Sequence, residues 1–131
     1  MTPIEDLFES DLDFAEKKMG KKLSIFLLDG DKKEFPEKRD MAYTQFEKKG
    51  APIKIVINPA LRNKDKYAQL GVLRHEIAHA VLMIDGDLDH SEIEADIFAE
   101  DIYGTRIWYN QDKIQTILPS RHPIRPDDLP K

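Results

Sequence analysis

The run HEIAH at residues 75–79 has the residue types and the spacing of a metal site. Two histidines four residues apart on an α-helix lie one turn apart on the same face, so both imidazoles can bind one ion. Glu76 lies one residue along, where it can reach a water bound to that ion. The spacing therefore predicts His75 and His79 as ligands of one zinc ion and Glu76 as the general base.

The segment that contains this run, YAQLGVLRHEIAHAVLMI at residues 67–84, has apolar residues on several faces. A helix with so little polar surface is buried in its domain. Polar groups inside a buried helix need partners, because unpaired buried polar groups cost several kcal/mol. A metal ion supplies such a partner. The alternative is that ordinary hydrogen bonds or an exposed face satisfy the two histidines.

Catalytic zinc usually has three protein ligands and keeps one position for water, so a third ligand must come from outside this helix. The chain contains no cysteine, which excludes a thiolate ligand, a cysteine nucleophile and a disulfide framework. The remaining candidates are the acids and histidines that follow the motif. They are Asp85, Asp87, Asp89, His90, Glu92, Glu94, Asp96 and His122.

The octapeptide EIEADIFA at residues 92–99 narrows this choice. On a helix, Glu92 and Asp96 share one face with two alanines, whose small side chains allow close approach to the HEIAH helix. Glu92 can then reach the ion, and Asp96 can accept a hydrogen bond from the far nitrogen of a ligand histidine. We therefore expect Glu92 as the third ligand, with Glu94 and His90 as the alternatives.

Hydrophobic periodicity and turn residues predict the elements that position these side chains. A capping box of Ser91 and Glu94 marks the start of the helix that bears Glu92. The strands at 41–47 and 53–58 should form a hairpin. In chain order we expect a helix at 3–19, strands at 23–28, 41–47 and 53–58, a helix from Asn63 or Asp65 to about Ile84, a helix at 91–104, and a last short helix within 108–118.

This order predicts an α+β fold in which helices cover a small three-stranded sheet. The helices are an N-terminal one, the HEIAH helix and a following glutamate-bearing helix. The length of 131 residues fits one compact domain, which we place at residues 1–118. Residues 119–131, PSRHPIRPDDLPK, contain four prolines and predict an extended tail.

Composition and charge exclude several classes of protein. The N-terminal segment MTPIEDLFESDLDF lacks the basic and apolar regions of a secretory signal, and no apolar stretch is long enough to span a bilayer. The net charge of −5 argues against a nucleic-acid partner, because phosphate binding needs a basic face. We therefore expect a cytoplasmic protein without a membrane or nucleic-acid partner. The sequence does not indicate an oligomeric state.

Three segments, IVINP at 55–59, HEIAH at 75–79 and EIEADIFA at 92–99, together resemble the gluzincin metallopeptidases. They look most like the ImmA/IrrE-type proteases, whose pattern is a strand ending in Asn-Pro, HExxH and E-x-x-A-[ND]-x-F-A. The resemblance covers residues 50–104. It implies a single zinc ion, Glu92 as its third ligand and Asp96 as a supporting carboxylate.

The chain departs from this pattern in two respects. The interval of thirteen residues from His79 to Glu92 is short for a gluzincin, and no helix-turn-helix or sensor domain is present. Very small single-domain gluzincins fit this length equally well. The family's cleavage of regulatory proteins therefore indicates only a type of substrate.

The resemblance implies a metalloendopeptidase in which Glu76 takes a proton from a zinc-bound water and passes it to the leaving amine. The substrate would be a protein or peptide lying along an edge strand, either Met41–Glu47 or Ile53–Asn58. The group that stabilises the oxyanion is left open. The candidates are Tyr103 and His90, followed by Tyr43, Tyr109 and His122.

Two other functions compete with this hypothesis. The chain could be a catalytically silent zinc-binding regulatory or structural protein, or an interaction protein of a phage or mobile element. Glu76 favours an enzyme, because a purely structural zinc site has no need of a base. A further alternative for the tail is that His122 occupies the open zinc position and inhibits the site.

Overall fold

The predicted α+β class is confirmed by the computed structural model, which describes residues 3–31, 33, 35 and 41–104, and the backbone of 107–109 and 115–117. The predicted tail at 119–131 and its His122 lie outside these residues. In chain order the elements are α1 (Ile4–Met19), β1 (Ile25–Asp29), β2 (Ala42–Gln45), β3 (Ile53–Ile57), the 3₁₀ helix η1 (Pro59–Asn63), α2 (Lys66–Ile84), α3 (Glu92–Tyr103), β4 (Ile107–Tyr109) and β5 (Gln115–Ile117).

The predicted helix within 108–118 is wrong, because the structure has the antiparallel strands β4 and β5 there. Their residues are IWY and QTI. Aromatic and β-branched residues of this kind favour strands over helices. The other predicted helices and strands are confirmed, and their ends differ by a few residues at most.

The main sheet has the strand order β1-β3-β2. The predicted hairpin is confirmed, since β2 is antiparallel to β3, with Thr44 opposite Ile55. β1 is parallel to β3, with Ile25 opposite Ile53. β3 is therefore the central strand and cannot receive a peptide along its edge. In the described part of the chain, β2 is an edge strand and lies beside α2.

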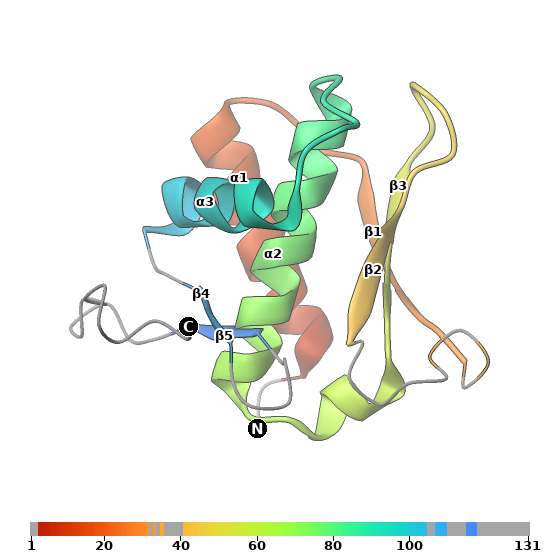
Figure 1. Ribbon diagram of the computed structural model, residues 1–131, viewed down its shortest axis with the longest axis vertical. Coiled ribbons are helices and arrows are strands. Elements are labelled where there is room, and N and C mark those ends of the chain that lie inside the picture. Colours follow the sequence, from red (N-terminus) through yellow and green to blue (C-terminus); the bar gives the residue numbers. More distant parts are fainter. Residues whose placement is uncertain are drawn as a thin grey trace.

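Helix α2 lies in the middle of the fold, between the sheet on one side and α1 and α3 on the other (Figure 1). Asp65 caps its start by accepting a hydrogen bond from the Ala68 amide at 2.9 Å. Almost every residue from Ala68 to Val81 is buried, as the lack of a polar face predicted. No helix of the described residues combines the length and the apolarity that a membrane span needs.

The core around α2 predicts a large loss of stability when a buried leucine is shortened. Leu73 is 0% exposed, so Leu73→Ala should lower the free energy of unfolding by about 2–5 kcal/mol through lost burial and a residual cavity. Urea unfolding followed by circular dichroism measures this. Leu88→Ala is the matched control, because Leu88 is 55% exposed and its truncation should cost at most about 0.5 kcal/mol. Equal losses in both variants would contradict the packing described here.

Candidate metal centre

Three electron-pair donors from α2 and α3 converge on one point. The Nε2 atoms of His75 and His79 are 2.9 Å apart. One Glu92 carboxylate oxygen lies 2.7 Å from Nε2 of His75, and the other lies 3.2 Å from Nε2 of His79. Among the described residues, these three form a group that could hold a metal ion, with one ligand atom from each.

Local structure explains how Glu92 reaches the histidines. The Ser91 hydroxyl accepts a hydrogen bond from the Glu94 amide at 3.1 Å and caps α3, which places Glu92 in its first turn. Ala95 and Ala99 are 0% and 1% exposed, so α3 can pack closely against α2. The predicted face of α3 is therefore the one that contacts the HEIAH helix. Glu94 is exposed and lies beside Ser91, as the capping prediction required.

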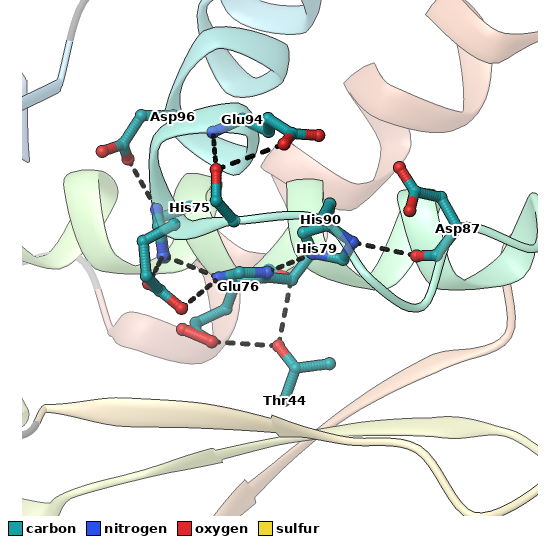
Figure 2. A network of polar contacts seen from close by, with 10 residues as sticks. Thr44, His75, Glu76, His79, Asp87, His90, Glu94 and Asp96 are labelled. Atoms are coloured by element: carbon teal, nitrogen blue, oxygen red, sulfur yellow. Dashed lines mark hydrogen bonds and ion pairs between the residues drawn. The ribbon is translucent and has the colours of Figure 1, made fainter.

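The far nitrogens of both histidines are hydrogen-bonded (Figure 2). Nδ1 of His75 lies 2.6 Å from the Asp96 carboxylate, and Nδ1 of His79 lies 2.5 Å from Nε2 of His90. Nδ1 of His90 lies 2.9 Å from the Asp87 carbonyl oxygen and must donate to it. With Nδ1 as the donor, Nε2 of His90 can accept a hydrogen bond from Nδ1 of His79. With Nδ1 of each histidine held by its partner, Nε2 is the nitrogen that would bind a metal ion in place of a proton.

Two imidazole nitrogens and a carboxylate that face one another favour a positive charge between them, which a bound proton or a metal ion can supply. Two nitrogens and one carboxylate oxygen form a donor set that binds divalent transition metals. In a tetrahedral site with ligand bonds of about 2.0–2.2 Å, donor atoms lie about 3.4 Å apart. The observed separations of 2.7–3.2 Å are only slightly shorter. The residues thus fit one metal ion.

The pKa values of Glu92 and His75 show the same preference for positive charge. The hydrogen bond from His75 holds the pKa of Glu92 at about 2 despite partial burial. Burial lowers the pKa of His75, but its bonds to Asp96 and Glu92 outweigh this and raise the pKa to about 9. Burial and the neighbouring His75 lower the pKa of His79. The field of the two carboxylates therefore favours a cation at this point.

Glu76 does not join the three ligand residues but lies beside them in a cavity of about 220 Å³ between β2 and α2. Its side chain is buried, and Oε1 lies 3.0 Å from the Thr44 hydroxyl, which also lies 3.2 Å from the Glu76 carbonyl oxygen. Burial raises the pKa of Glu76 to about 7, although the charge of His75 and the Thr44 bond lower it. A carboxylate with this pKa can accept and release a proton near neutral pH.

The structure places Tyr103, a predicted oxyanion donor, in a different contact. Its hydroxyl donates to the Asp11 carbonyl oxygen at 2.8 Å, and its ring lies 4.7 Å from the Arg74 guanidinium. These contacts direct the hydroxyl towards α1. His90, the other main candidate, has its Nε2 on His79 instead. The side chain of Tyr109 and all of His122 lie outside the described residues.

Sequence reasoning missed the contact of Thr44 with Glu76 and the contact of His90 with His79. Thr44 lies on a strand 32 positions before Glu76, and no local pattern connects them. His90 stood among the possible ligands and oxyanion donors. Its contact depends on the turn after α2, where Gly86 has a positive φ of 94°.

Comparisons of this chain with protein-family models, curated proteins and solved structures find no match. The structure itself shows a His-His-Glu group that could hold a metal ion, between two helices of an α+β fold.

Proposed function

We propose that this chain is a zinc-dependent metallopeptidase of the gluzincin type, similar to the ImmA/IrrE proteases. The observation that carries the proposal is the convergence of three lone-pair donors beside a buried carboxylate of raised pKa. Zinc bound by His75, His79 and Glu92 would polarise the scissile carbonyl and make water nucleophilic at neutral pH. Asp96 and His90 orient the two histidine rings through their Nδ1 atoms.

Glu76 moves the proton in this mechanism. Its carboxylate accepts a proton from the attacking water as the water oxygen bonds to the carbonyl carbon. It then delivers that proton to the amide nitrogen as the carbon–nitrogen bond breaks, so the carboxylate is regenerated. The Thr44 hydroxyl holds Oε1 in the cavity and keeps the carboxylate directed between β2 and α2.

A peptide substrate would lie along β2. Edge strands accept an additional strand through their free backbone groups, and specificity comes from pockets for alternate side chains. β2 borders the cavity that contains Glu76 and His79, so a strand added there would pass the metal centre. Tyr43, one of the expected oxyanion candidates, also lines this cavity.

Removal of the metal tests the function as a whole. The zinc-loaded chain should hydrolyse casein or a mixed peptide library, and a chelator should abolish hydrolysis because the polarising ion is lost. Activity should return when zinc is added after the chelator is dialysed away. Elemental analysis should show about one zinc ion per chain before treatment. Full hydrolysis by protein whose metal content is verified as negligible would refute the proposal.

One observation favours a catalytically silent zinc-binding interaction protein as the second candidate. Phe26 and Leu28 on β1 are 54% and 44% exposed, and such large apolar side chains suit a partner surface. A silent site would show no chelator-sensitive hydrolysis of any substrate, while zinc would still raise the thermal unfolding temperature. Glu76 favours the peptidase, since its burial costs stability that a structural zinc site has no reason to retain.

A further inference from the structure

A second cavity of about 200 Å³ lies at the end of the sheet where β2 turns into β3. The C-terminal end of α2 and the residues just before β1 complete its wall. The buried and half-buried side chains of the lining are mainly apolar and include Phe46, Ile53 and Met83. An apolar cavity of about 150 Å³ can bind benzene, so this one is large enough for an aromatic or branched aliphatic side chain.

This cavity continues the groove that contains the metal centre. Met83 lines both cavities. Glu76, His79 and Met83 follow one another at helical spacings of three and four residues, so they share one face of α2. Thr44 lies on β2, and Phe46 follows one residue after its end; the two side chains, two residues apart, both line the side that meets this helix. The two cavities are therefore successive positions along one groove between β2 and α2.

The order of Thr44 and Phe46 along the chain determines which part of a bound peptide would contact the second cavity. Thr44 contacts Glu76, so the bond to be cleaved lies near Thr44. Phe46 lies two residues after Thr44, just past the end of β2, and two residues of an extended peptide span about 7 Å. Antiparallel pairing is the commoner arrangement, and a peptide antiparallel to β2 has its N-terminal part towards Phe46. The second cavity then lies two or three residues before the scissile bond.

The exposed rim of this cavity is basic. Lys22 and Lys49 line it, and no acidic residue of the described chain does. Asp85, which follows α2, forms an ion pair with Lys21 at 2.5 Å, so its charge is balanced. The chain as a whole has a net charge of −5, and a basic rim is thus a local feature that attracts negative charge.

We propose that this cavity is a specificity pocket of the metallopeptidase, an inference that rests on the proposed function. The pocket binds an apolar side chain two or three residues N-terminal to the scissile bond. The lysines on its rim favour an acidic residue beside that side chain. The substrate class is therefore a protein with an acidic-apolar segment in extended conformation just before the cleavage site.

Binding to the zinc-loaded Glu76→Gln chain tests the pocket without turnover. The probes are two labelled synthetic peptides that carry a phenylalanine beside either an aspartate or a lysine, and fluorescence anisotropy gives their affinities. The aspartate peptide should bind more tightly, and Lys22→Glu with Lys49→Glu should weaken it about tenfold. Lys18→Glu with Lys66→Glu is the matched control, because both lysines are exposed away from this cavity and the net charge changes equally.

A second variant and a cleavage map test the apolar part. Ala51→Trp fills the cavity and should weaken both peptides, whatever their charge. In a mixed peptide library cut by the wild-type chain, apolar residues should be enriched two or three positions before the cleaved bond, and Ala51→Trp should remove this enrichment. Equal affinities for both peptides in all variants, or no measurable binding, would overturn the pocket. Charge-dependent binding without cleavage of any peptide would instead refute the peptidase proposal alone.

Discussion

Glu92→Ala is expected to cause the largest loss of zinc binding among single substitutions outside the HEIAH run. The variant removes the carboxylate that, among the described residues, lies against Nε2 of both histidines. Its zinc affinity should fall by more than the roughly 10–100-fold that is typical for loss of a residue that only supports a ligand. Competition with a chromogenic zinc chelator, together with elemental analysis, measures the change.

Two neighbouring substitutions calibrate this result. Glu94→Ala, two residues away on the same helix, should leave zinc affinity unchanged, because the Glu94 carboxylate lies beside Ser91. His90→Ala should lower the affinity about 10–100-fold, since His79 loses the partner of its Nδ1. A normal zinc content in Glu92→Ala with a deficit in Glu94→Ala would assign the third ligand to Glu94 and refute the centre described here.

Glu76→Gln should separate zinc binding from catalysis. Glutamine has nearly the same shape but cannot accept the proton of the attacking water, so kcat should fall about 10²–10⁴-fold. Zinc affinity should stay within a few fold, because Glu76 is not among the three residues whose donor atoms converge. Peptide hydrolysis and zinc competition on the same preparation give both values.

The same chemical change at an exposed site provides the control for Glu76. Glu94→Gln should retain wild-type hydrolysis, because Glu94 is exposed. This result would show that replacing a glutamate by glutamine does not by itself reduce hydrolysis. Undiminished hydrolysis by Glu76→Gln would exclude Glu76 as the base. A loss of zinc in the same variant would instead assign it a part in metal binding.

The structure confirms most of the predicted elements because their signals are local. Asp65 caps α2 and Ser91 caps α3, each through a bond within one helical turn. The segment 108–118 misled the helix prediction because its short strands have too few residues for a clear alternation. Its aromatic and β-branched residues were the better indicator.

The sequence by itself determined the positions of the two histidines, of Glu76 beside them and of the face of α3 that carries Glu92 and Asp96. These features follow from the fixed rise and rotation of an α-helix, so spacing alone places the side chains. The tertiary structure decided which candidate acid meets the histidines and that β2, unlike β3, is an edge strand. It also decided that Thr44 contacts Glu76 and that His90 contacts His79. Such contacts join segments far apart in the chain or depend on one turn. They are set by the packing between elements, which no local pattern in the sequence encodes.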